Sequence, residues 1–440
     1  MMKYFYILIL LNLIITFTPF KLASYILPFI TLGYIIIFYK SRILIIKSLL
    51  WVSLWVFMAL FYGILYPDFY YVNTLIAFVT WSGLFVILSL PYLGRYAYIT
   101  VRKIEKWVWL ILLIESTLGI SQAVYGALRG GGFDLNNGDH VEGTIHPWLP
   151  PENAYANVMF AINIIILLLY LLPQIDKKIY KYVIYILGII VFILASVMHA
   201  IIFLIISYIL TTIILSSQKV NIKWIFIMGL FIFSTIILLP ILMPKNVNLI
   251  DKFIFQLTSG EVPRSASIKV ALIELPKEYP LQPIVGLGPG QYSSRAGLIC
   301  TGYYFGGFRD PKYIPYLPNS PTTPQQRYLI PLWKWHASNI YFGSTQKPYS
   351  SWISIYTEWG LIGIFAILFI LIFSLSQVYL LQTSYLTKAS IMTIIWFIFL
   401  LGFQENNWEI PQAWFGSLML IRLLYDSEKY KIERLGVERS

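Results

Sequence analysis

The residues of this chain that could do chemistry are concentrated in one hydrophilic segment, residues 244–350, which lies between long apolar runs. The segment carries Arg264, the turn Gly286-Leu-Gly-Pro-Gly290, many aromatic side chains and seven prolines between Pro311 and Pro348. A guanidinium group binds phosphate oxygens in pairs, and closely spaced prolines favour a rigid, irregular chain. The segment is therefore predicted to cover a cleft in which a lipid-linked substrate meets the membrane.

After Arg264, the spacing of apolar residues predicts a short amphipathic helix that lies on the membrane surface. The apolar positions are Ile268, Ala271, Leu272 and Leu275. Gly286, Gly288 and Gly290 allow tight backbone turns and the close approach of a ligand or another helix. A plain turn is the other interpretation of these glycines, and a solvated or headgroup-binding charge is the other interpretation of Arg264.

The composition of the whole chain indicates an integral membrane protein. Of the 440 residues, 58% are hydrophobic and 12% are charged, and the mean hydropathy is +0.72. Soluble proteins carry about 25% charged residues. The apolar runs are continuous rather than alternating, which disfavours a β-barrel. We therefore expect an all-α polytopic membrane protein with about 12 transmembrane helices and a large, partly helical extracytoplasmic loop.

Hydrophobic run length predicts where the spans lie. The predicted spans are 4–20, 23–39, 48–66, 74–92, 107–125, 154–173, 182–197, 199–216, 224–243, 351–373, 389–403 and 413–425. The predicted units are an N-terminal bundle of about nine spans (1–243) with an outer loop at 126–153, the large loop 244–350, C-terminal transmembrane helices (351–425) and a cytoplasmic tail (426–440). Residues 182–216 fit either two short spans that turn near Ser196–His199 or one long broken helix with a re-entrant piece.

The basic residues predict the orientation, because cytoplasmic loops carry an excess of Lys and Arg. Alternate short loops and the C-terminal tail hold Lys40, Arg42, Lys47, Arg95, Arg102, Lys103, Lys106, Lys177, Lys178, Lys181, Lys219, Lys223, Lys429, Lys431, Arg434 and Arg439. Both termini are therefore predicted to lie in the cytoplasm. The apolar run after Lys3 resembles a signal sequence, but no small-residue cleavage site follows it, so we interpret it as a retained first helix.

Other classes of function find little support in the sequence. The net charge of +12 comes mostly from short loops between spans, so nucleic-acid binding is not expected. The four histidines, His140, His146, His199 and His336, lack metal-ligand spacing, and no metal or cofactor is expected. Cys300 is the only cysteine and cannot form a disulfide within the chain.

Two stretches carry motifs with a recognisable order. The first contains Arg264, the amphipathic segment, Pro280–Pro283 and the sequence Gly-Leu-Gly-Pro-Gly-Gln-Tyr292; the second is Pro348-Tyr-Ser-Ser-Trp-Ile-Ser-Ile-Tyr-Thr-Glu-Trp-Gly-Leu-Ile-Gly363. They resemble the outer loop and the re-entry helix of the superfamily of Wzy-type O-antigen polymerases and lipid A core O-antigen ligases. In that superfamily a His-Asn or similar pair precedes Gly-x-x-Gly. Tyr349 and Ser350 occupy those positions here, which disfavours the ligase branch.

Two further segments match the same superfamily more loosely. Gly143-Thr-Ile-His-Pro147, with the following Glu152-Asn153, is similar to the outer segment before the sixth span. The stretch Leu194–Ala200 occupies the position of an element with a basic residue, where His199 stands in this chain. The resemblance covers roughly residues 140–370.

The resemblance implies a GT-C-like fold and a glycosyl transfer on the outer face of the bacterial inner (cytoplasmic) membrane. The implied donor is a glycan on undecaprenyl diphosphate, and the acceptor is a sugar hydroxyl of another lipid-linked unit. The reaction is expected to invert the anomeric carbon without a metal. The implied partners are the undecaprenyl-diphosphate-linked oligosaccharide, membrane lipids, a chain-length regulator and a flippase.

This chemistry needs cations at the departing diphosphate and groups that hold sugar rings. Arg264 is the first candidate for the diphosphate contact, and the weaker candidates are Arg129, Arg295, Arg309 and Arg327. The other predicted substrate-binding residues are His199, Gly288, Gly290 and Tyr292. The aromatic side chains of the loop either stack on sugars or form an interfacial belt; they include Tyr303, Tyr304, Phe305, Tyr313, Tyr316, Trp333, Trp335 and Tyr341.

Four residues are candidates for the base that takes the proton of the acceptor hydroxyl. His336 belongs to the residue type that titrates in the useful range. Tyr349 inherits the family position, but a tyrosine needs a strongly lowered pKa to act as a base and could instead donate a hydrogen bond. Glu152 and Glu358 could each act as the base, or could cap a helix or form an ion pair.

Two alternatives to a polysaccharide polymerase remain. One is an O-antigen or protein glycan ligase of the same superfamily, and the other is a flippase or transporter of lipid-linked oligosaccharides. A flippase is expected to carry charged residues along several spans and to lack a large one-sided loop. Charged residues in the middle of the predicted spans are scarce, with Glu115 and His199 as the examples, and the loop is one-sided, so the sequence favours the enzyme.

Overall fold

The computed structural model describes residues 4–130, 141–146, 156–175, 178–216, 262–303, 311–314, 321–338 and 348–437, together with Gly229 and Ile237. Every regular element in these ranges is helical, and seven of the helices are long and apolar enough to cross a membrane. A helix satisfies its own backbone hydrogen bonds in lipid, which is why long apolar runs adopt this form. The architecture is that of an all-helical, multi-pass membrane protein.

The helices follow the apolar runs in order along the chain. The first half contains α1 (Phe5–Thr16), α2 (Lys21–Tyr39), α3 (Arg42–Leu65), α4 (Tyr71–Ser89), α5 (Arg95–Gly130), α6 (Ala156–Leu171), α7 (Ile179–Leu194) and α8 (Met198–Leu215). The inserted segment, defined here as residues 262–338, contains α11 (Pro263–Lys269), α12 (Leu275–Glu278), α13 (Gln282–Val285), α14 (Arg295–Cys300) and α16 (Ile330–Ser338). The last helices are α17 (Ser351–Leu380), α18 (Tyr385–Leu401) and α19 (Pro411–Val437).

Eleven of the twelve predicted spans coincide with these helices, and the remaining one, 224–243, lies outside the described residues apart from two positions. The seven helices that reach the length and apolarity of a span are α2, α3, α4, α5, α6, α8 and α17, whereas α1, α7 and α18 are apolar but shorter. The figure of about 12 spans therefore stays a prediction. Residues 182–216 form two helices, α7 and α8, which are separated at Ser196 with a φ of 57°.

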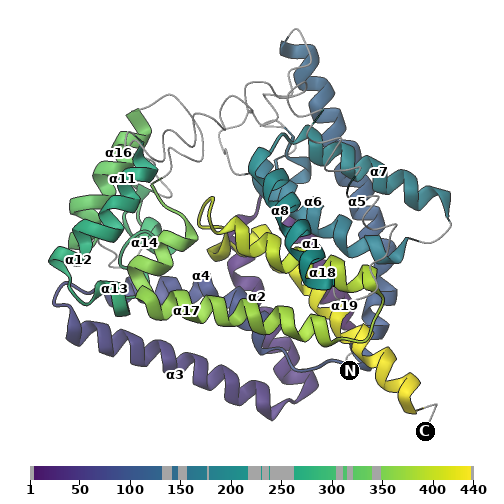
Figure 1. The fold of residues 1–440 in the computed structure, drawn as a ribbon, viewed down its shortest axis with the longest axis horizontal. Coiled ribbons are helices and arrows are strands. Elements are labelled where there is room, and N and C mark those ends of the chain that lie inside the picture. Colours follow the sequence, from purple (N-terminus) through teal and green to yellow (C-terminus); the bar gives the residue numbers. More distant parts are fainter. Residues whose placement is uncertain are drawn as a thin grey trace.

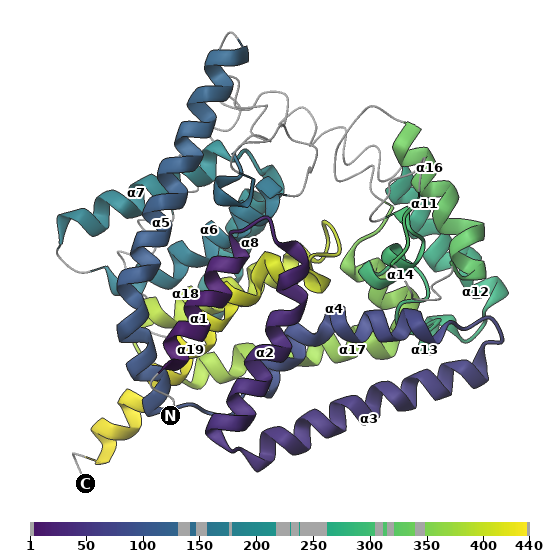
Figure 2. The ribbon, with the colours of Figure 1, turned by 180° about the vertical axis from the view of Figure 1, so that it is seen from behind.

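The helices form two groups, each with its own apolar core (Figure 1). In the larger group, α19 packs against α1, α5 and α6, and α6 is buried along its whole length. A helix that is apolar on all sides is stable in such a position. In the smaller group, α14 packs on α4 and α13 packs on α17, so the inserted segment lies over one end of these membrane helices. Seen from behind, α3 lies along the edge of this smaller group (Figure 2).

The helix predicted after Arg264 is present. Ala271 and Leu275 are buried, whereas Ile268 is 36% exposed and Leu272 is 55% exposed. A π-helical turn, η5 (Val270–Glu274), lies between α11 and α12, and its hydrogen bonds from residue i to i+5 widen the helix at that point. The position of this helix on the membrane surface stays a prediction.

Two glycines allow α13 to lie directly against α17. Gly286 ends α13 with a φ of 80°, and Gly360 interrupts α17 with a φ of 62°. A Cβ atom on Gly286 would overlap the backbone of Glu358, and one on Gly360 would overlap the carbonyl of Ile284. Both positions therefore require glycine for their backbone conformation and for the close approach of the two segments.

We expect Gly360→Ala to lower stability by about 2 kcal/mol or more, because strained backbone alone costs ~1–3 kcal/mol and the added methyl group meets backbone atoms. Gly33→Ala in α2 is the matched control, since a Cβ there meets nothing within 4 Å, and alanine is favoured over glycine in a helix by ~1 kcal/mol. Thermal denaturation in detergent measures both. Equal melting temperatures for the two variants would contradict the packing described here.

Candidate functional site

Three segments that are far apart in the sequence meet in one buried region, called here the polar junction. They are the loop before α14 (Gly286–Arg295), the start of α17 (Tyr349–Gly360), and the connection between α18 and α19 (Gly402–Ile410). The last segment includes a short 3-10 helix, η8 (Asn407–Glu409). The junction lies at the end of the membrane helices over which the inserted segment is placed (Figure 1).

Glu358 holds the glycine-rich loop against α17. Its Oε2 accepts a hydrogen bond from the backbone N–H of Gly290 at 2.5 Å, and its Oε1 accepts from the N–H groups of Tyr292 and Ser294, both at 2.9 Å. The side chain has no exposed surface. Bonds from N–H groups to a carboxylate are stronger than those between neutral groups, so this one side chain fixes five residues of the loop.

The interruption of α17 adds two backbone bonds to this contact. The N–H of Leu287 donates to the carbonyl of Thr357, and the N–H of Gly288 donates to the carbonyl of Glu358, both at 2.9 Å. A helix leaves carbonyl groups without intrahelical partners where it ends, and the non-helical Gly360 lies just beyond these two residues. The loop therefore occupies the acceptors that the interruption provides.

Arg295 and Glu409 connect the loop to the α18–α19 connection. The backbone N–H of Arg295 donates to Oε2 of Glu409 at 2.6 Å, and both side chains are buried. Oε1 of Glu409 has no hydrogen-bond partner among the described residues. Burial, and then the nearby Glu358 carboxylate, raise the pKa of Glu409 well above its ordinary value, against the lowering effect of Arg295. The neutral acid is therefore favoured at this position.

Arg264 also binds the α18–α19 connection. Its guanidinium donates to the carbonyl of Phe403 at 2.9 Å and to that of Gln404 at 2.5 Å, and the residue is 4% exposed. Asn406 completes the contact, because its amide donates to the carbonyl of Ser293 at 2.7 Å and accepts from the hydroxyl of Ser354 at 3.3 Å. Arg264 thus belongs to the junction through protein contacts of its own.

Other predicted site residues lie at the border of the junction. Tyr349 is buried against Trp333 of α16, with ring centroids 4.7 Å apart. Tyr292 is fully buried, and this burial raises the pKa of its hydroxyl. Gly288 and Gly290 allow the loop to pack against side chains of α3 and the backbone of α4. The structure therefore groups Arg264, Gly288, Gly290, Tyr292, Arg295, Tyr349 and Glu358.

The remaining predicted site residues lie away from the polar junction or outside the residues that the structure describes. His199 begins α8 beside Phe203, in the larger group of helices. Arg327 is 62% exposed and pairs with Glu278. The backbone of His336 belongs to α16 and that of Arg129 to α5, but their side chains, like all of Glu152 and Arg309, lie outside the described residues.

The α18–α19 connection is the part of the site that the sequence analysis missed. Its sequence from 404 to 409, Gln-Glu-Asn-Asn-Trp-Glu, lies between two apolar helices and is buried. A segment of six residues is too short to form a unit of its own. Five polar side chains between two apolar helices were the available signal for a buried polar site. Short outer loops indicate orientation through their charge, and this criterion does not register the polar side chains of the α18–α19 connection.

A second, smaller contact joins α5 to residues 141–146. Oε2 of Glu115 accepts from the N–H of Thr144 at 2.9 Å, and Oε1 of Gln122 accepts from the N–H of Glu142 at 2.9 Å and from that of Gly143 at 2.8 Å. This segment carries the looser of the sequence resemblances. It is fixed to α5 and is not part of the polar junction.

Comparison of the chain with family models, with curated proteins and with solved structures found no match. Among the described residues, no group of three or more His, Cys, Asp or Glu side chains could hold a metal ion.

Glu358→Gln is expected to destabilise the protein by about 1–3 kcal/mol, because the amide group of glutamine turns a donor toward backbone N–H groups and leaves one unpaired. The matched control is Glu274→Gln, which removes a half-exposed partner of Lys277. Surface pairs of this kind contribute less than ~1 kcal/mol. The check is thermal denaturation in detergent, and a Glu358→Gln variant as stable as the control would contradict the role assigned to Glu358.

The raised pKa of Glu409 predicts that the stability of the folded protein falls as pH rises. Because the folded protein raises its pKa above the unfolded value of ~4.3, the stability contribution is complete below that value and is lost as pH rises toward the folded pKa. Glu409→Gln should therefore gain stability relative to the unmodified protein as pH rises above ~4.3 toward the raised pKa of the folded protein. Melting temperatures across this range test the prediction, and a pH-independent difference would contradict it.

Proposed function

We propose that this chain is a membrane glycosyltransferase, a polysaccharide polymerase that joins undecaprenyl-diphosphate-linked repeat units on the outer face of a bacterial inner membrane. The observation that carries the proposal is the contact made by Glu358. It joins the two stretches on which the sequence resemblance depends, the Arg264–Tyr292 segment and the Pro348–Gly363 segment. Motifs separated by more than fifty residues thus belong to one region, as a shared site requires.

The proposed reaction is a displacement at the anomeric carbon of the donor glycan. The oxygen of an acceptor hydroxyl forms a bond to this carbon, and the bond from the carbon to the diphosphate oxygen breaks. Undecaprenyl diphosphate leaves with the bonding electron pair, and the acceptor proton passes to a base. The growing chain remains linked to the lipid of the acceptor, so the step can be repeated.

The junction holds two cations that could act on a diphosphate leaving group. Arg264 and Arg295 place two guanidinium groups in buried surroundings, where charges act on one another more strongly than in water. The buried side chains of Glu358, Glu405 and Glu409 lie in the same junction, and the raised pKa of Glu409 makes its ionised form less favourable. In the proposal, the two arginines stabilise the departing diphosphate through their field while they remain bound to their protein partners.

Glu358 is proposed as a positioning residue, because both of its oxygens already accept backbone hydrogen bonds. His336 is the proposed base. Histidine is the residue type that titrates in the range useful to a general base. The backbone of His336 belongs to α16, a helix whose Trp333 packs on Tyr349 at the border of the junction.

The test uses the purified protein in nanodiscs with the undecaprenyl-diphosphate-linked repeat unit of the host, with EDTA present, and separates the glycolipids on a gel. A ladder of dimers, trimers and longer chains is expected. His336→Ala should reduce the rate by about 100-fold or more, the usual contribution of a general base. Lys334→Ala, an exposed cation on the same helix, should leave the rate unchanged.

The other outcomes separate the alternatives. Transfer that occurs only after addition of lipid A core, without any ladder, would replace the polymerase by the ligase. Movement of the lipid-linked unit across the bilayer without any new glycosidic bond would replace the enzyme by a flippase. Full activity of His336→Ala would place the base elsewhere, and Glu152 would be the next residue to replace.

A further inference from the structure

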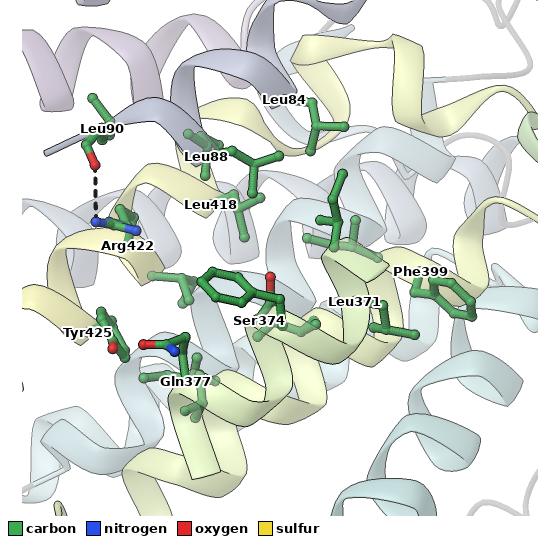
Figure 3. A pocket seen from close by; sticks show the side chains of 18 of the residues that line it. Leu84, Leu88, Leu90, Leu371, Ser374, Gln377, Phe399, Leu418, Arg422 and Tyr425 are labelled. Carbon is green, nitrogen blue, oxygen red and sulfur yellow. Dashed lines mark hydrogen bonds between the residues drawn. The ribbon is translucent and has the colours of Figure 1, made fainter. Parts of the chain in front are cut away.

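An apolar groove of about 430 Å³ lies between the second half of α17 and the helices α4, α18 and α19 (Figure 3). Its volume falls within the ~300–1,000 Å³ of ligand-binding pockets. Most of its lining is aliphatic or aromatic, and it includes Leu84, Leu88, Leu371, Phe399 and Leu418. A groove with such walls between membrane helices fits a hydrocarbon chain.

One end of the groove is basic. Arg422 and Lys429 of α19 and Lys47 of α3 are the cations of the lining, and Asp426, which pairs with Arg422 at 3.5 Å, is its single acid, so three positive charges stand against one negative charge. Arg422 donates to the carbonyl of Leu90 at 3.2 Å, and its Nε has no hydrogen-bond partner among the described residues. Figure 3 shows Arg422 and Tyr425 on one side of the groove and Phe399 on the other.

The basic end is distant from the polar junction. α19 begins at Pro411, directly after Glu409 and Ile410. With a rise of 1.5 Å per residue, Arg422 lies ~17 Å and Lys429 ~27 Å farther along this helix. A phosphate bound there cannot be the diphosphate that the proposed reaction would release at the junction.

We propose that the groove binds an anionic glycerophospholipid, with one acyl chain between α4, α17, α18 and α19 and the phosphate beside Arg422, Lys429 and Lys47. Charge complementarity selects this occupant, because an apolar channel with a cationic end matches an amphiphile with an anionic head. The sequence predicts that Lys47 and Lys429 face the cytoplasm, where anionic lipids concentrate and attract basic residues. This site is independent of the glycosyl-transfer proposal.

The experiment measures lipid bound to the purified, full-length protein by native mass spectrometry, with phosphatidylglycerol and phosphatidylcholine of the same acyl chains as probes. One phosphatidylglycerol should remain bound in preference to phosphatidylcholine. Lys47→Gln with Lys429→Gln should weaken the binding about five-fold for each lysine removed. Lys269→Gln with Lys277→Gln, which removes two exposed lysines that do not line the groove, should leave it unchanged.

A second pair of variants tests the position of the acyl chain. Ser374→Phe places a ring in the groove, whereas Ser376→Phe alters an exposed serine of the same helix that does not line it. Only Ser374→Phe should abolish lipid retention. The proposal is wrong if both lysine pairs behave alike, if Ser374→Phe retains the lipid, or if phosphatidylcholine binds equally well. Displacement of phosphatidylglycerol by undecaprenyl phosphate, with no effect of the groove lysines, would assign the groove to the polyprenyl chain instead.

Discussion

The carboxylate of Glu358 is the group on which the arrangement of the inserted segment depends. It lies within a membrane-embedded helix, has no exposed surface, and accepts three backbone hydrogen bonds from the loop between α13 and α14. A buried carboxylate is costly unless its oxygens are satisfied. The backbone N–H groups of the loop donate the hydrogen bonds that these oxygens need, and the same bonds hold the loop in one position against α17. The buried carboxylate and the loop conformation therefore stabilise each other.

This mutual dependence extends through the rest of the polar junction. Arg264 and Asn406 fix the α18–α19 connection to α11 and to the loop, while Ser354 fixes it to α17. A network of satisfied polar groups is rigid because each change leaves an unpaired donor or acceptor. Not every atom of the junction is satisfied, because one oxygen of Glu409, the amide oxygen of Asn407 and the hydroxyl of Tyr292 have no hydrogen-bond partner among the described residues. The junction thus combines a largely satisfied frame with a few unsatisfied polar atoms.

The sequence predicted the membrane helices well because apolar run length is a local property. The sequence did not predict the features that depend on contacts between residues far apart in the chain. The π-helical turn at Val270–Glu274 was not predicted, and the role of Glu358 depends on loop residues that lie more than sixty positions earlier in the chain. The role of Arg264 as a diphosphate contact stays a prediction, and its contacts with two carbonyls of the α18–α19 connection could not be deduced from its neighbours in sequence.

The junction and the groove are held at a constant separation by α19. Near its start, this helix is fixed by Gln412, which donates to the carbonyl of Thr18 at 2.6 Å, and by Ser417, which donates to Asn163 at 2.5 Å. Both bonds connect α19 to the larger group of helices, where an unpaired amide would be costly in apolar surroundings. A helix held in this way cannot slide along its axis without breaking these bonds. Arg422 and Lys429 of the groove therefore lie on a helix that is held in place, and the buried carboxyl of Glu409 lies two residues before the first residue of that helix.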